Sequence, residues 1–217
     1  MPHTESFEEL LTAMKRAAAA LRDADVPFLL GGGLACWARG GPRTEHDVDF
    51  FLRPEHADAA LEALSRAGMT VERPPERWLV KAWDGEILLD VIYEPAGRVV
   101  DDAMFARGEE LDVHAVGMLV ASLEDVIATK LMSIGEQNLD FSSPLETARA
   151  LREQIDWDVV RGWTAESPYA RAFFVLLEGL DIVPPGHPSP NGWAASTSTA
   201  ERMPTSRPSS TTGKRRT

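Results

Sequence analysis

The chain has 217 residues, of which 44% are hydrophobic and 26% charged, with a formal net charge of −12. One sizeable core is expected at this length. The single cysteine excludes an internal disulfide. The lack of a leader-type N-terminus or long apolar run favours a cytoplasmic protein without a membrane span. Residues 1–183 carry 17 basic and 33 acidic side chains, a charge of −16, which disfavours long-range attraction of nucleic acid and favours cationic small molecules or metal ions.

Helical and strand-like patterns alternate in the first third of the chain. Ser6 and Glu9 form a capping-box signal, and the residues that follow place apolar side chains on one helical stripe. A glycine turn separates the first strand-like segment from a short helical one, and Pro54 marks the start of a later helix. The patterns predict a helix, a strand, a short helix, a strand and a helix at residues 7–21, 26–30, 34–38, 47–52 and 54–68.

A hairpin is predicted next. Residues 78–83 and 86–93 are strand-like and flank Asp84-Gly85, a dipeptide typical of tight hairpin turns. Residues 111–120 are expected to form one further strand, although Gly117 interrupts the pattern. The sheet should therefore contain antiparallel strands beside the earlier ones.

Only helices are expected after residue 121. Ser122 and Asp125 form a second capping-box signal, and further helical segments are predicted near residues 144–153, 157–163 and 168–180. From residue 184 the sequence is rich in Pro, Ser and Thr and poor in apolar residues, which is typical of disorder. We therefore predict three regions: a catalytic lobe at 1–121, a helical lobe at 122–183 and a disordered tail at 184–217.

Three aspartates lie within or beside apolar strand segments. Side chains alternate along a strand, so Asp47 and Asp49 should share one face while Val48 points toward a core. Adjacent carboxylates repel unless a cation lies between them, and Mg²⁺ binds through such groups together with substrate phosphates. Asp90 interrupts the apolar run 87–92, where a charge is costly. If the two strands are neighbours, the acids can converge on two metal ions roughly 3.5–4 Å apart.

Glycines precede these acids. A glycine turn that opens a helix exposes backbone N–H groups beside the positive end of the helix dipole, which favours phosphate binding. Without a Cβ at Gly32 or Gly33, the backbone can approach an anion closely. An ordinary turn would explain the glycines alone, but in combination with the aspartates they predict a phosphate site.

These features together resemble the nucleotidyltransferase superfamily. The chain has a strand, Gly32-Gly33, thirteen intervening residues, Asp47-Val48-Asp49 and a later Asp90, where the superfamily has Gly-Gly or Gly-Ser, Asp-x-Asp or Asp-x-Glu, and a third carboxylate. The resemblance is closer to the small bacterial branch of AbiEii-type toxins and aminoglycoside nucleotidyltransferases, and it covers residues 7–180. It implies an α+β fold in which a mixed β-sheet with flanking helices precedes a helical C-terminal lobe.

The resemblance also implies an activity: transfer of a nucleoside monophosphate from an NTP to an acceptor hydroxyl, with release of pyrophosphate. Asp47, Asp49 and Asp90 would hold two Mg²⁺ ions, and Asp90 would also accept the proton of the attacking hydroxyl. The residues implied in nucleotide binding are Gly32, Gly33, Arg43 and Lys130.

The acceptor stays open. The likeness along the helical lobe favours the tRNA 3′ end, and the protein would then be a toxin with an antitoxin protein as its partner. The acidic composition favours an aminoglycoside or another cationic small molecule. A non-catalytic relative that binds nucleotide or a partner protein is a third interpretation, which the intact acid triad argues against.

Some candidates have simpler explanations. Many members of the branch have Ser or Thr two residues before the first aspartate, where this chain has Glu45, and this departure weakens the toxin interpretation. Arg43 could contact a phosphate or balance Glu45. Lys130 could be an ordinary helix-flank lysine. Asp140, which matches an acid after that helix in the family, could instead cap a turn.

Overall fold

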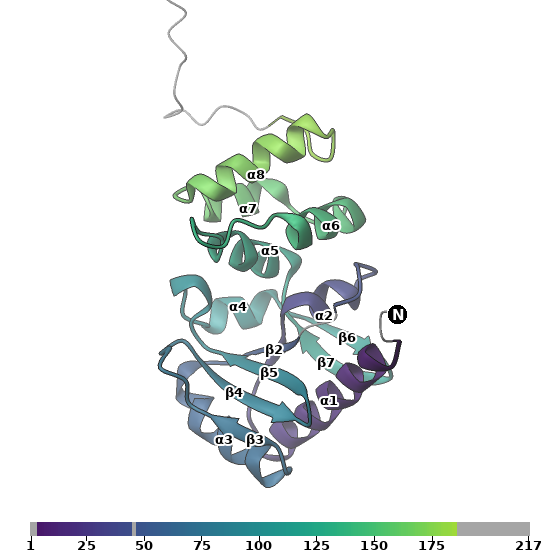
Figure 1. The fold of residues 1–217 in the computed structure, drawn as a ribbon, viewed down its shortest axis with the longest axis vertical. Coiled ribbons are helices and arrows are strands. Elements are labelled where there is room, and N and C mark those ends of the chain that lie inside the picture. The colour runs from purple at the N-terminus through teal and green to yellow at the C-terminus, as the bar shows by residue number, and fades with distance from the viewer. Residues whose placement is uncertain (1–3, 45–46, 186–217) are drawn as a thin grey trace, which may run out of the picture. The chain divides into compact units, whose positions relative to one another are not determined.

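The described strands form one mixed sheet. The computed structural model describes residues 4–44 and 47–185, and its seven-stranded sheet has the order β3-β4-β5-β2-β1-β7-β6 (Figure 1). The strands are β1 (Leu29–Leu30), β2 (Asp47–Phe51), β3 (Thr70–Glu72), β4 (Leu79–Asp84), β5 (Ile87–Ile92), β6 (Glu109–Val113) and β7 (Val116–Val120). The pairings β2 with β5 and β1 with β7 are parallel and the others antiparallel.

Helices flank this sheet and follow it, as the sequence predicts. They are α1 (Thr4–Asp23), α2 (Gly32–Trp37), η1 (Pro54–His56), α3 (Ala57–Arg66), η2 (Pro95–Gly97), α4 (Asp102–Arg107), α5 (Leu123–Met132), α6 (Ser142–Leu151), α7 (Trp157–Trp163) and α8 (Pro168–Gly179). The fold is therefore α+β. Helix α4, the short helix η2 and strand β3 are additional to the predicted elements. Among the described residues, no helix has the length and apolar character needed to cross a membrane.

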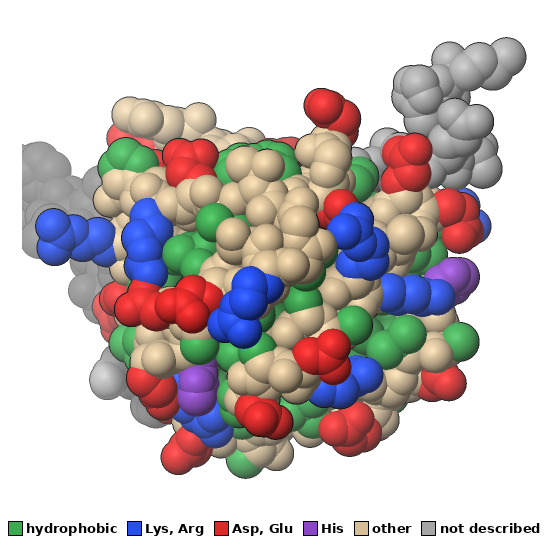
Figure 2. Space-filling model, turned by 90° about the horizontal axis from the view of Figure 1, so that it is seen from below, with side chains coloured by type: hydrophobic (Ala, Val, Ile, Leu, Met, Phe, Trp, Pro, Cys, Tyr) green, Lys and Arg blue, Asp and Glu red, His purple; other side chains and the backbone are tan. Residues whose placement is uncertain are grey.

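Helix α1 contacts β2 and β5, α3 contacts β3 and β4, and the two helices contact each other, so they cover one face of the sheet (Figure 1). The predicted stripe of α1 is buried, with Met14 and Leu21 fully inaccessible. Val48 and Phe50 of β2 are also fully buried, whereas Asp47 and Asp49 keep partial exposure. The alternation of β2 therefore leaves its acids on the opposite face. The surface seen in Figure 2 carries acidic and basic side chains intermixed.

The predicted hairpin is present, but its turn differs by one residue. Asp84 pairs with Ile87, so Gly85 and Glu86 are the turn residues. Gly85 has φ +64°, and glycine is favoured at the first central position of a type II′ turn because it tolerates positive φ. This register places Lys81 of β4 opposite Asp90 of β5.

The single strand predicted at residues 111–120 is wrong. The segment forms a hairpin of β6 and β7, in which Val113 pairs with Val116. The two turn residues between them, His114 and Ala115, have φ of 50° and 65°, a conformation that tight hairpin turns require and that non-glycine residues seldom adopt. The sequence lacks the usual turn glycine here, so the hairpin is not evident from it.

The four helices α5 to α8 follow the last strand. The predicted α5 face is buried, including Ile127 and Leu131, and the Ser122 hydroxyl accepts a hydrogen bond from the Asp125 backbone N–H at 3.1 Å. Helix α5 contacts α2 and η2, so it lies close to the glycine turn. The predicted lobe boundary falls between β7 and α5, and the division into lobes stays a prediction. The predicted tail spans residues 184–217, and its residues 186–217 lie outside the described residues.

Candidate active site

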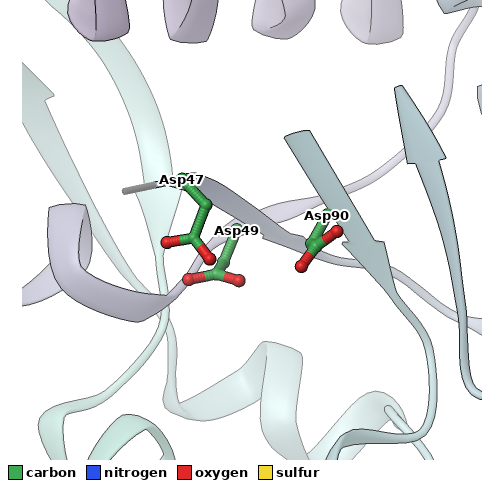
Figure 3. A group of neighbouring side chains, drawn as sticks. All are labelled: Asp47, Asp49 and Asp90. Atoms are coloured by element: carbon green, nitrogen blue, oxygen red, sulfur yellow. The ribbon is translucent and has the colours of Figure 1, made fainter. Parts of the chain in front are cut away.

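Three aspartates converge at the centre of the sheet. Parallel pairing of β2 and β5 places Asp49 directly beside Asp90, and alternation along β2 puts Asp47 on the same face. One carboxylate oxygen from each residue lies within 4.8 Å of those of the other two, and all three carboxylates point to the same side (Figure 3). The structure thus brings together the acids that the sequence predicts to be neighbours.

The cluster is short of positive charge. Burial, reinforced by the Asp47 carboxylate and opposed by Lys130, raises the pKa of Asp49 from 3.8 to about 7. Burial also raises the pKa of Asp90, although Lys81 opposes this shift. The Lys81 ammonium lies 3.2 Å from Asp90 Oδ1, but this buried oxygen accepts no well-aligned hydrogen bond from the described part of the chain. A hard divalent cation with oxygen ligands fits such a donor set.

The glycine turn lies directly against the acidic strand. The Gly31 N–H donates to the Asp49 backbone carbonyl at 2.8 Å. Gly32 has φ +54°, and a Cβ on it would lie 1.6 Å from Asp49 Oδ2. A Cβ on Gly33 would lie 2.6 Å from the Thr44 Cβ. The turn therefore requires glycine because its own chain fills the adjacent space, a reason that the sequence did not reveal.

Two cavities open on either side of Asp47 and Lys130, which line both. The first has a volume of about 630 Å³ and contains Asp49 and Asp90 together with apolar walls. The second, of about 600 Å³, is more polar. Further lining residues are Phe51, Trp78, Ile92, Glu94 and Val126 in the first cavity and Gly33, Arg43, Thr44, Ser143 and Glu146 in the second.

The basic residues predicted for nucleotide binding lie at these cavities. The Lys130 ammonium donates to the Ser143 hydroxyl at 3.3 Å, which directs it from α5 toward the start of α6. The Arg43 guanidinium lies over the Phe7 ring, 5.0 Å from its centroid. Glu45, the alternative partner of Arg43, lies outside the described residues.

Asp140 is apart from the aspartate cluster. Its carboxylate accepts a hydrogen bond from the Ser142 N–H at 2.8 Å, and this bond holds the pKa of the exposed Asp140 below its usual value. The residue lines neither cavity. The capping alternative therefore describes Asp140.

Two residues beside the acids do not stand out in the sequence. Lys81 pairs with Asp90, and Trp78 lines the apolar cavity while 41% of it stays exposed. A hairpin turn placed at Gly85 and Glu86, rather than at Asp84 and Gly85, would have identified Lys81. Trp78 is the first residue of the predicted strand 78–83, and in the structure it precedes β4, so the strand pattern does not indicate its position at the cavity.

The comparisons with known proteins agree with this geometry. A family model described as nucleotidyl transferase of unknown function (DUF2204) matches residues 10–161. This chain belongs to that nucleotidyltransferase family. A search of curated proteins gave no match.

Solved structures share the fold of this nucleotidyltransferase. The solution structure of the antibiotic-resistance factor ANT(2″)-Ia is 18% identical, covers 81% of this chain and 98% of its own, and gives a TM-score of 0.59. The crystal structure of ANT(2″)-Ia with adenylyl-2″-tobramycin is also 18% identical, covers 75% of this chain and 98% of its own, and gives a TM-score of 0.57. At this identity the likeness shows a common fold.

Proposed function

We propose that this nucleotidyltransferase moves a nucleoside monophosphate from an NTP to a hydroxyl of a small-molecule acceptor and releases pyrophosphate. The supporting observation is the convergence of Asp47, Asp49 and Asp90 beside the glycine turn. In the reaction the acceptor oxygen bonds to the α-phosphorus, and the bond from that phosphorus to the bridging oxygen of the β-phosphate breaks. The acceptor proton passes to the Asp90 carboxylate.

The three aspartates would hold two Mg²⁺ ions. When bound, these ions offset the charge of the phosphates and of the transition state. Asp47 and Asp49 contribute ligands from one face of β2, and the buried Asp90 Oδ1, which has no well-aligned hydrogen-bond donor among the described residues, contributes another from β5. Burial and the neighbouring Asp47 carboxylate raise the pKa of Asp49, and a bound cation would offset this repulsion between the acids.

The polar cavity suits the triphosphate. Its lining has two cationic side chains, Arg43 and Lys130, two carboxylates, Asp47 and Glu146, and the three hydroxyl groups of Thr44, Ser143 and Thr147. Backbone N–H groups of a glycine turn favour phosphate oxygens. We assign the β- and γ-phosphates to this cavity, where Gly33 and Lys130 lie in the wall, and to the adjoining Gly32 backbone, which lines the first cavity.

The apolar cavity suits the acceptor, because Asp90 lies in its wall and Asp90 must reach the attacking hydroxyl. Its volume of about 630 Å³ is within the range of sites for drug-sized molecules, which are mostly apolar with a few polar groups. Among its lining residues, Glu94 and the aspartates would favour a cationic group, whereas Arg77 and Lys130 would oppose one. ANT(2″)-Ia is described with adenylyl-2″-tobramycin, so aminoglycosides are the first acceptors to test.

The tRNA 3′ end is the second candidate acceptor, with an antitoxin protein as partner. The partly exposed Trp78 favours it, since an aromatic face can stack on a terminal base. The charge of −16 over residues 1–183 favours the small molecule, because RNA binding usually needs a basic surface.

A labelling experiment tests both acceptors. Purified protein is incubated with Mg²⁺ and each of four NTPs labelled at the α-phosphate, and is offered total RNA, tobramycin and a small-molecule extract. We expect label in a small-molecule product. Label in RNA would establish the second candidate instead.

A matched pair of variants links the label to the site. Asp47→Asn should abolish transfer, whereas Asp112→Asn makes the same chemical change at an exposed residue that lines neither cavity and should leave transfer unchanged. If no acceptor gains label in an Asp47-dependent manner, the protein is a non-catalytic relative and the proposal is wrong.

A further inference from the structure

A row of charged residues crosses four neighbouring strands. Asp49 of β2 pairs with Asp90 of β5, Asp90 pairs with Lys81 of β4, and Lys81 pairs with Glu72 of β3. Directly paired residues lie on the same face of a sheet, so these side chains form a line that leads from the acid cluster to the sheet edge. Lys81 is the basic residue of this line and lies next to the third acid.

The contact between Lys81 and Asp90 is partly buried. The side chains are 27% and 15% exposed, and Lys81 Nζ lies 3.2 Å from Asp90 Oδ1. The same oxygen accepts no well-aligned hydrogen bond within the described ranges. Lys81 therefore supplies positive charge to this oxygen from 3.2 Å, and a bound Mg²⁺ would approach such an oxygen to about 2.0–2.1 Å.

The ammonium and a metal ion shared with Asp90 thus compete for one carboxylate. Lys81 is in register with Asp90 and is separated from Asp49 by a strand, so its effect on Asp49 is the smaller one, and the main cationic influence on Asp49 is Lys130. We propose that Lys81 is the resident counter-ion of Asp90, and that it weakens the metal position shared with Asp90 relative to the position at Asp47 and Asp49.

This arrangement has a consequence for the order of binding. The position at Asp47 and Asp49 fills at the lower metal concentration. The position that includes Asp90 fills once phosphate oxygens of the nucleotide add ligands that outweigh the competition from Lys81. Lys81 is then a positioning residue: because it competes for Asp90, the metal position that includes Asp90 is filled mainly when the nucleotide is bound. The inference rests on the proposed metal site but not on the identity of the acceptor.

The test is a titration of the nucleotide-free protein with Mn²⁺, followed by the paramagnetic signal of the free ion. Wild type should show a tighter and a weaker position. Lys81→Met should tighten the weaker position at least tenfold, because a unit charge at contact distance from a partly buried carboxylate is removed, while the tighter position changes less than about threefold. Lys81→Arg, which keeps the charge, should resemble wild type.

Two controls separate local competition from general electrostatics. Lys15→Met removes a lysine of α1 that lines neither cavity and should change neither position. Lys130→Met removes a charge near Asp49 and should not selectively tighten the weaker position. Equal tightening of both positions by Lys81→Met, or the same behaviour in Lys81→Arg, would overturn the inference. Circular dichroism of each variant verifies folding.

The failure of the proposed function has a different signature. If Asp49→Asn leaves the Mn²⁺ titration of wild type unchanged, the aspartates are not the metal site, and both proposals are wrong. If Asp49→Asn abolishes binding but Lys81→Met does not alter the weaker position, the metal site stands and the role of Lys81 alone is wrong.

Discussion

Gly32 and Asp49 share one corner of the site, because the Asp49 carboxylate occupies the space that a side chain on Gly32 would fill. An added Cβ would lie 1.6 Å from Asp49 Oδ2 and 2.5 Å from its carboxyl carbon. Gly32 also has φ +54°, where residues with a Cβ are strained. The glycine turn and the acidic strand are therefore sterically coupled.

Gly32→Ala should displace the Asp49 carboxylate and so disrupt the metal site. We expect at least a hundredfold loss of transfer, comparable to removal of a group that stabilises the transition state, together with weaker Mn²⁺ binding. Gly40→Ala is the matched control, because Gly40 has φ +90° but nothing within 4 Å of an added Cβ. It should lower stability by roughly 1–2 kcal/mol and leave Mn²⁺ binding intact. Equal Mn²⁺ affinities in both variants would contradict the coupling.

The stability of the metal-free protein should depend on the protonation of Asp49. Its pKa is about 7 in the folded state against an ordinary 3.8. Between these values the folded protein holds a proton that the unfolded chain has released, so this group stabilises the fold at low pH and the contribution is lost as pH rises to 7. The loss should be on the order of 2–4 kcal/mol.

Urea unfolding in EDTA from pH 5 to 8 measures this effect. Asp49→Asn cannot titrate, so its free energy of unfolding should fall less than that of wild type over the same range. Mg²⁺ should restore stability to wild type at pH 8 but not to the variant. Parallel pH profiles of the two proteins would show that Asp49 does not carry the shift.

Lys130 should act on the nucleotide rather than on the fold. It lines both cavities, and its partner is the Ser143 hydroxyl. Lys130→Met removes a charge-assisted phosphate contact, so we expect the KM for NTP to rise roughly tenfold to a hundredfold, as for a contact to a charged group of about 1.5–3 kcal/mol. Ser143→Ala removes only the orienting bond and should have a smaller effect. Initial rates at varied NTP concentration show whether Lys130→Met raises the KM for NTP more than Ser143→Ala does.

Asp125 should contribute to the stability of the fold and not to activity. It is fully buried, and both of its oxygens accept from the Arg107 guanidinium at 2.8 Å. Arg107 also lies over the Trp163 ring, so one acid joins α4, α5 and α7. Asp125→Ala leaves Arg107 unpaired and should lower the free energy of unfolding by about 3 kcal/mol. Mn²⁺ affinity should be unaltered, and a change larger than threefold would argue against a purely structural role.

The sequence predicted the parts of the site that depend on strand periodicity. Alternation sufficed to place Asp47 and Asp49 on one face, because Val48 and Phe50 are fully buried on the other. Asp90 stood out because a charge within an apolar strand needs a local reason. The structure adds that the strands of Asp49 and Asp90 are paired in parallel register.

The remaining features depend on geometry that composition does not encode. Lys81 faces Asp90 only because the hairpin turns at Gly85 and Glu86 rather than at Asp84 and Gly85. The hairpin that turns at His114 and Ala115 has no glycine at its turn positions, so the sequence does not indicate it. The space beside Gly32 is filled by Asp49 from another segment, a contact that appears only once the chain is folded.

The parallel pairing of β2 with β5 has a consequence for synthesis of the chain. Asp49 and Asp90 belong to segments separated by α3, β3 and β4, and such non-local pairings form late because loop closure must precede them. A nascent chain that ends before β5 has only part of the cluster. The complete metal site therefore forms only after β5 has paired with β2, and metal binding to it should stabilise the folded protein by mass action.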